Sequence, residues 1–208
     1  MIYTKKIPKA DLLVKASLIK QGWIPLKEAP NLLIAILLSV PFMILNGLIC
    51  YGVLYLFNPT YAALVLDTLN ASSWAFTIRF DYILYVYLLI VVHELLHLVF
   101  IPNFYRSKKT YWGIKLWGGF VYTQEVLTKR RFLIVSLAPF VLLSLIVPMI
   151  LGWFGWLNMF LLVLVFFNAL SSSVDTLNFV TVVLQVPNKS LLVNEGFESF
   201  YLPKSQTS

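Results

Sequence analysis

The sequence predicts an all-α integral membrane protein with about four transmembrane helices and a small β-hairpin between the second and third. The chain is 60% hydrophobic and only 12% charged, against about 45–50% and about 25% in soluble domains. Its mean hydropathy is +0.83. Four apolar segments reach or exceed the length of about 20 residues that a helix needs to cross the hydrocarbon core. These predicted spans cover residues 31–57, 82–101, 133–151 and 157–186.

The segments outside the spans divide the chain into three parts. Residues 1–30 carry six lysines between apolar side chains, which predicts a basic N-terminal segment with a short amphipathic helix at the membrane interface. Residues 31–186 hold the four spans and form one membrane domain, in which residues 58–80 are expected to be a polar connection. Residues 187–208 are expected to be a polar tail.

The loop of residues 103–132 is predicted to contain a β-hairpin. Alternating, aromatic-rich stretches lie on either side of Gly118 and Gly119, which predicts a turn at the glycine pair. Two roles are open for this hairpin. It is either a cap over the helix ends or an edge strand that pairs with an extended substrate backbone.

The charge distribution predicts the orientation in the membrane. With four spans, 15 of the 16 lysines and arginines fall on one side, in the N-terminal segment, the hairpin loop and the tail. The positive-inside rule assigns that side to the cytoplasm, so both termini are expected to be cytoplasmic. Basic residues in this setting indicate contact with the lipid bilayer and its anionic headgroups rather than with nucleic acid.

The second predicted span contains the only two histidines of the chain, in the sequence His93-Glu94-Leu95-Leu96-His97. Positions i and i+4 share one face of a helix, so His93 and His97 are expected to bind one metal ion. Glu94 can then act as a general base on a water molecule at the metal. Ionisable side chains are costly in a bilayer, which favours a functional role for this cluster. The alternatives are a chance motif and a proton-relay pair.

Asp175 is the best candidate for a third metal ligand. No third histidine exists, and the single cysteine, Cys50, excludes a cysteine-based zinc site. Apart from Glu94, every other acidic residue falls in a predicted loop, edge or tail. The helical rise places Asp175 at about the same depth as the histidine motif. Two imidazoles and a carboxylate form a ligand set typical of catalytic Zn²⁺.

Asn168 lies two helical turns before Asp175, on the same face of the predicted helix. Two interpretations are open. Asn168 either acts in catalysis, through oxyanion stabilisation or a hydrogen bond to a metal ligand, or it joins helices by hydrogen bonds.

Over roughly residues 80–186 the sequence resembles the putative zincin peptidase family of small bacterial membrane proteins, which is related to the site-2 proteases. The resemblance rests on the histidine motif, the basic hairpin, Ser136-Leu137-Ala138-Pro139-Phe140 and the segment from Asn168 to Asp175. It implies zinc bound by His93, His97 and Asp175, with Glu94 catalytic, in a bacterial cell membrane. The chain departs from the larger site-2 proteases because Thr176 stands where they have glycine, and no proline lies between Asn168 and Asp175. It also has no recognisable PDZ domain.

These observations predict an intramembrane zinc metallopeptidase that hydrolyses peptide bonds of membrane-associated proteins, using zinc-activated water and Glu94 as the base. Two alternatives belong to other classes. One is a non-catalytic metal-binding module, or pseudoprotease, that binds membrane partners. The other is an ion-coupled transporter, which the lack of repeat symmetry disfavours.

Overall fold

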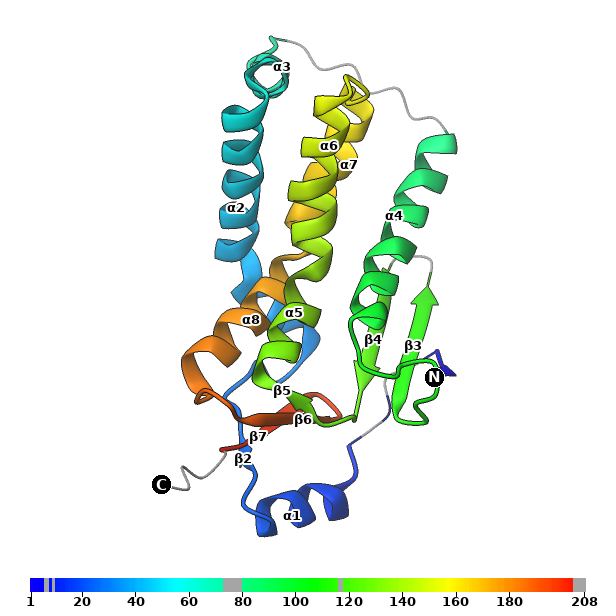
Figure 1. The fold of residues 1–208 in the computed structure, drawn as a ribbon, viewed down its shortest axis with the longest axis vertical. Helices are drawn as coiled ribbons and strands as arrows, with labels where there is room; N and C mark the ends of the chain where they lie inside the picture. Colours follow the sequence, from blue (N-terminus) through cyan, green and yellow to red (C-terminus); the bar gives the residue numbers. More distant parts are fainter. Residues whose placement is uncertain (6–7, 9, 73–79, 116–117, 204–208) are drawn as a thin grey trace.

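The fold is a bundle of four long helical segments with two small β-sheets at one end (Figure 1). The computed structural model describes residues 1–203 except 6–7, 9, 73–79 and 116–117. Four segments of these described residues are helical and, by length and composition, apolar enough to cross a membrane, which agrees with the expected number of long apolar helices and suggests an integral membrane protein. The segments are α2 (Leu32–Phe57), α4 (Phe80–Val99), α5 to α6 (Lys129–Trp153) and α7 to α8 (Met159–Gln185).

Three of the segments begin at a residue that caps the helix. The side chains of Asn31, Thr128 and Asn158 accept hydrogen bonds from the backbone N–H groups three residues later. Asparagine and threonine are favoured at this position because their side-chain oxygens satisfy an otherwise free helical donor. The cap at Thr128 places the basic residues that follow it in the first turn of α5 rather than in a loop.

The third and fourth segments are interrupted helices. The third consists of α5 (Lys129–Pro139), the π-helix η1 (Phe140–Ile146) and α6 (Val147–Trp153). Pro139 and Pro148 lie close to the two junctions, and proline lacks the N–H that an α-helix requires. The fourth consists of α7 (Met159–Ser171) and α8 (Ser173–Gln185), and the chain changes direction at Ser172 between them (Figure 1).

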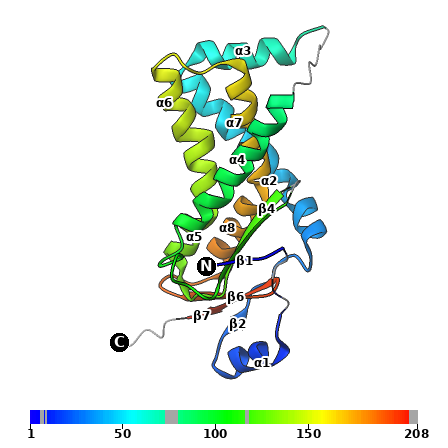
Figure 2. The same cartoon turned by 90° about the vertical axis from the view of Figure 1, so that its right-hand side faces the viewer.

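Part of the connection predicted over residues 58–80 is helical. Helix α3 (Pro59–Leu69) begins at a proline, which is favoured in the first helical turn. It lies across the end of the bundle opposite the sheets (Figure 2). The prediction of a plain polar connection was therefore wrong for α3, whose residue Ala62 lies in one buried cluster with Leu54 of α2.

The first sheet contains the predicted hairpin. Its order is β1 (Ile2–Tyr3), β3 (Thr110–Lys115) and β4 (Gly118–Thr123), with β3 and β4 antiparallel. The expected turn at Gly118 and Gly119 was wrong, because both glycines belong to β4 and pair with Lys115 and Ile114. Strand β4 has no partner on its second edge among the described residues.

The second sheet was not predicted from the sequence. Its order is β2 (Ile24–Pro25), β7 (Glu198–Leu202), β6 (Leu191–Glu195) and β5 (Leu127–Thr128). The segment expected to be a plain tail therefore forms the β6–β7 hairpin as far as Leu202, while residues 204–208 lie outside the described part. Gly196 sits in the two-residue turn with φ +66°, a conformation that glycine adopts without strain.

The N-terminal segment contains the predicted short helix, α1 (Leu12–Lys20). This helix lies at the far end of the molecule, beyond the second sheet (Figures 1 and 2). Leu12 and Leu13 are exposed on it. Its contact with a membrane interface stays a prediction.

Helix α2 packs along α7 and α8 and holds the interrupted fourth segment in place. One buried cluster joins α2, η1 and α7 through Cys50, Phe140, Val165 and Ala169. A second buried cluster joins α8 to the second sheet. Helix α8 packs on α2 and α5, and its contact with α4 is made by the Asp175 side chain.

Candidate metal centre

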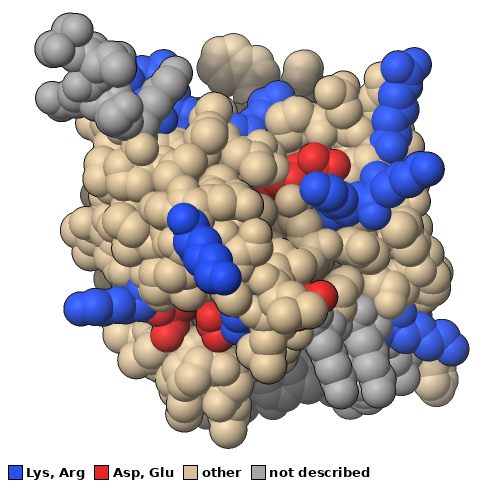
Figure 3. All heavy atoms as spheres, turned by 90° about the horizontal axis from the view of Figure 1, so that it is seen from below, with Lys and Arg blue, Asp and Glu red and all other residues tan. Residues whose placement is uncertain are grey.

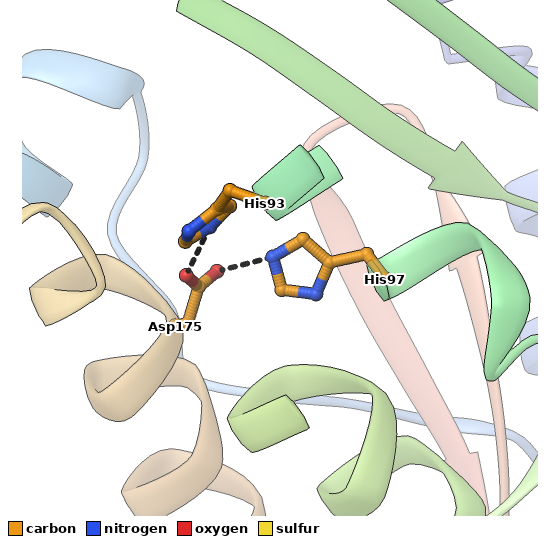
Figure 4. Close-up of side chains that lie close together, drawn as sticks. All are labelled: His93, His97 and Asp175. Atoms are coloured by element: carbon orange, nitrogen blue, oxygen red, sulfur yellow. Dashed lines mark ion pairs between the residues drawn. The ribbon is translucent and has the colours of Figure 1, made fainter. Parts of the chain in front are cut away.

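Three predicted ligands from two distant helices converge at one point. His93 and His97 lie one turn apart on α4, and Asp175 lies in the first turn of α8 (Figure 4). His93 Nε2 is 3.3 Å from Asp175 Oδ2, and His97 Nε2 is 3.4 Å from Asp175 Oδ1. All three side chains are largely shielded from solvent. The sequence-based expectation that these residues come together is thus met in the structure.

The hydrogen bonds of Asn168 determine which nitrogen of His93 faces Asp175. The Asn168 side-chain nitrogen lies 3.1 Å from the Pro139 carbonyl oxygen, which can only accept, so this atom is the N–H donor. It also donates to Ser144 Oγ at 2.8 Å, and Ser144 Oγ donates to the Val165 carbonyl. Asn168 Oδ1 therefore faces His93 Nδ1, at 2.9 Å, and accepts its proton. The neutral imidazole then has its lone pair on Nε2.

His97 is oriented in the same way by a backbone carbonyl. His97 Nδ1 lies 2.7 Å from the Val135 carbonyl oxygen, so Nδ1 is the donor. Val135 is four residues before Pro139, and proline has no N–H to give to that carbonyl. The break in α5 thus leaves free the acceptor that His97 uses. Hydrogen bonds from the second imidazole nitrogen are the usual way in which metal-binding histidines are oriented.

When both imidazoles are neutral, their Nε2 lone pairs and the Asp175 carboxylate meet with no proton between them, whereas a protonated imidazole forms an ion pair with Asp175. Two imidazole nitrogens and a carboxylate face one another, as they do around a cation. A tetrahedral zinc with bonds of about 2.0–2.1 Å places neighbouring ligand atoms about 3.3–3.4 Å apart. The two distances, 3.3 and 3.4 Å, are close to this value and end on the two different oxygens of Asp175. One ligand atom from each of the three residues lies within 4.8 Å of the others, so the three side chains could hold a metal ion, and their types are those of a catalytic zinc site.

Glu94 lies beside the ligands, between α4 and strand β4. A cavity of about 200 Å³ opens next to it, lined by His93, Glu94, Gly119 and Asn168 among others. Gly119 packs directly on the Glu94 side chain, because a Cβ there would overlap Glu94 Cγ and lie 3.0 Å from Cδ. The cavity is large enough for several water molecules of about 30 Å³ each. A carboxylate, the ligands and space for water thus share one side of the site.

Asn168 is 1% exposed, and its amide is fully used by the contacts to His93, Pro139 and Ser144. Both N–H bonds of the amide have acceptors, so neither is free for an oxyanion. The geometry favours the interpretation of Asn168 as a hydrogen-bonding partner of a metal ligand.

The first turn of α8 is held by a polar side chain that the sequence analysis did not single out. Asn46 of α2 is fully buried, and its Nδ2 donates to the Ala169 carbonyl and to Thr176 Oγ1, each at 3.0 Å. Thr176 follows Asp175, so this contact fixes the backbone next to the third ligand. An asparagine in the middle of an uncharged span was the available signal in the sequence.

The roles of three further residues were not predicted. Pro139 frees the carbonyl for His97, Ser144 orients the Asn168 amide, and Gly119 allows β4 to approach Glu94. Each affects a side chain more than 20 positions away in the chain, so no local motif reports the role.

Comparison with protein families agrees with the geometry. Residues 86–191, about half of the chain, match the family described as putative zincin peptidase, and this range includes every residue of the centre except Asn46. No match was found among curated proteins or among solved structures. The matched range covers the histidine helix, the hairpin, the interrupted third segment and Asp175. The chain therefore belongs to the putative zincin peptidase family.

Proposed function

We propose that the protein is an intramembrane zinc metallopeptidase that cleaves membrane-associated proteins. The observation that carries the proposal is the convergence of His93, His97 and Asp175 beside Glu94, within helices long and apolar enough to cross a membrane. Family membership supports peptidase chemistry with zinc as the cofactor. The positive-inside rule assigns the end with the sheets to the cytoplasm of a bacterial cell.

In this proposal His93, His97 and Asp175 hold the zinc. Zinc, when bound, would activate a water molecule and polarise the carbonyl group of the peptide bond. A carboxylate oxygen of Glu94 takes the proton of the water and later gives it to the nitrogen of the leaving amine. Asn168 and the Val135 carbonyl keep the Nδ1 protons of the two histidines in place, so that both Nε2 atoms face the metal.

Strand β4 is the proposed platform for the substrate. Its free edge begins at Gly118 and Gly119, which line the cavity beside Glu94. An extended peptide can add to such an edge through backbone hydrogen bonds. This pairing would keep the substrate backbone open to attack, whereas a helical substrate has its amides engaged in internal hydrogen bonds.

The proposal is tested by comparing the wild type with Glu94→Gln, His93→Ala and Asp67→Asn. The full-length proteins are expressed in bacteria, and the new protein termini in the membrane fraction are identified by mass spectrometry. Purified samples are analysed for bound zinc. Asp67 is exposed on α3, at the opposite end of the bundle, so Asp67→Asn serves as the control.

We expect one zinc per chain in the wild type, Glu94→Gln and Asp67→Asn, and little in His93→Ala. New termini should occur with the wild type and Asp67→Asn and be lost with Glu94→Gln. Bound zinc with identical termini in the wild type and Glu94→Gln would reject the peptidase and indicate the non-catalytic metal-binding alternative. Absence of zinc from the wild type would reject the metal centre itself.

A further inference from the structure

A second cavity lies at the end of the molecule that carries the sheets. Its volume is about 430 Å³, within the range of about 300–1,000 Å³ common for ligand pockets. Its walls come from the start of α2 with the segment before it, from α8, and from the β6–β7 hairpin. On α8, Val174 and Asn178 line it, on either side of Asp175 in the sequence. The cavity therefore reaches the helix that supplies the third metal ligand.

Strand β4 connects this cavity with the one beside Glu94. Gly118 and Gly119 line the first cavity, and Tyr122 lines the second. Tyr122 lies three positions after Gly119 on the extended strand, a distance of about 10 Å. The β4 position of Tyr122 is fixed, because its hydroxyl donates to the Asn194 carbonyl at 3.2 Å and accepts from Gly196 N at 2.8 Å. A peptide paired along the free edge of β4 would run from the first cavity to the second.

The second cavity contains an oriented carboxylate. Glu28 Oε2 accepts from Ser199 N at 2.7 Å, and Glu28 Oε1 accepts from Ser199 Oγ at 2.9 Å. An ionised carboxylate has about four lone-pair positions, so two acceptor positions remain. Within the described part of the chain, no lysine or arginine forms an ion pair with Glu28; Lys27 also lines the cavity, but its ammonium group makes no ion pair with this carboxylate. The carboxylate is thus held in position on the cavity wall with capacity for a further donor.

The chemistry of membrane proteins suggests which donor would reach it. Their cytoplasmic flanks are enriched in lysine and arginine. The second cavity lies at the end that the same rule assigns to the cytoplasm, and Figure 3 shows that end with basic side chains on its surface and acidic groups between them. A substrate cut at the metal centre would place its basic flank on this side.

We propose that the second cavity is a substrate subsite that receives a lysine or arginine side chain, which binds the Glu28 carboxylate. The distance along β4 places this side chain about three residues from the cleaved bond. The subsite gives the peptidase a preference for sites next to a basic flank, and it rests on the proposed peptidase function.

The test uses the full-length protein in bilayers. Cleavage sites are collected from the membrane fraction for the wild type, Glu28→Gln, Glu28→Lys and Glu198→Gln. Glu198→Gln is the matched control, since Glu198 is exposed on β7, pairs with Lys15 and does not line the cavity. A cleaved protein found in this way is then reconstituted, and the residues on each side of its cleaved bond are replaced one at a time by lysine, alanine or glutamate.

We expect wild-type sites to be enriched in lysine or arginine about three residues from the cut, on one side. Replacing that residue by alanine should lower kcat/KM about tenfold, as for loss of a charge-assisted hydrogen bond. When the enzyme carries Glu28→Gln, the alanine replacement in the substrate should have little further effect on kcat/KM. The Glu28→Lys enzyme should favour substrates with glutamate at that position. Glu198→Gln should behave as the wild type.

A binding measurement separates the subsite from the reaction. In the Glu94→Gln background, a photo-crosslinking amino acid replaces Phe197, an exposed residue on the cavity wall. The substrate with lysine at the preferred position should crosslink more than the alanine version, and addition of Glu28→Gln should remove the difference. If the wild type cleaves nothing, the proposed function fails. If it cleaves without any dependence on Glu28, the subsite is rejected while the peptidase stands.

Discussion

Asn168 Oδ1 lies 2.9 Å from His93 Nδ1, and this contact determines that His93 presents Nε2 to Asp175. The Asn168 amide oxygen is the acceptor in this contact, because the amide nitrogen donates to the Pro139 carbonyl and to Ser144 Oγ. A residue of α7 and the π-helix η1 together thus orient a ligand on α4.

Replacement of Asn168 by leucine should weaken zinc binding. The leucine side chain is similar in size but cannot accept the His93 Nδ1 proton, and loss of such a partner typically costs about 10–100-fold in metal affinity. Asn168→Asp should recover much of that affinity, because a carboxylate still accepts the proton. Competition with a zinc chelator in detergent measures both. Equal affinity of Asn168→Leu and the wild type would contradict the role of this contact.

Pro139→Ala should also weaken zinc binding, by about tenfold. Alanine restores an N–H that competes with His97 for the Val135 carbonyl. Pro148→Ala is the matched control, because the carbonyl four residues before it belongs to Ser144 and accepts from Cys50 Sγ instead. The control should retain wild-type zinc affinity in the same chelator titration. Equal losses in both variants would point to general straightening of the helix.

Gly119→Ala should abolish most cleavage while zinc stays bound. The added Cβ overlaps the Glu94 side chain, and displacement of a catalytic group by about 1 Å can cost about 100-fold in rate. Gly52→Ala is the control, since no atom lies within 4 Å of a Cβ added there. Turnover and bound zinc are measured on the same preparations. Wild-type turnover in Gly119→Ala would show that β4 does not restrict Glu94.

The contribution of Glu28 to stability should fall as pH rises. Burial raises the pKa of the Glu28 carboxyl above its ordinary value of 4.5, so the folded protein binds this proton more tightly than the unfolded chain does. The stabilisation is therefore complete below about pH 4.5 and is lost as pH rises through the raised pKa. Thermal unfolding in detergent should show the wild type losing stability relative to Glu28→Gln over the interval from about pH 4.5 upward. A gain over this interval would contradict the direction of the shift.

The sequence alone determined the parts of the protein that depend on local pattern. Apolar length predicted the four spans, and the i, i+4 spacing placed His93 and His97 on one helical face. Asp175 could be selected because few acidic residues lie in apolar sequence. The alternation of side chains predicted the hairpin of β3 and β4 but misplaced its turn at Gly118 and Gly119, which belong to β4; Gly119 packs against Glu94 of α4 instead.

Only the tertiary structure decided the contacts that orient these residues. The β6–β7 hairpin gains its partners from β2 and β5, which lie far away in the chain. The carbonyl freed by Pro139 and the amide of Asn168 acquire their roles only when α4 packs beside them. A hydrogen bond between distant segments requires each donor to find its acceptor in the assembled bundle, and no periodicity along the chain records that pairing. The sequence therefore selects the candidate ligands, and the fold determines which of their atoms face one another.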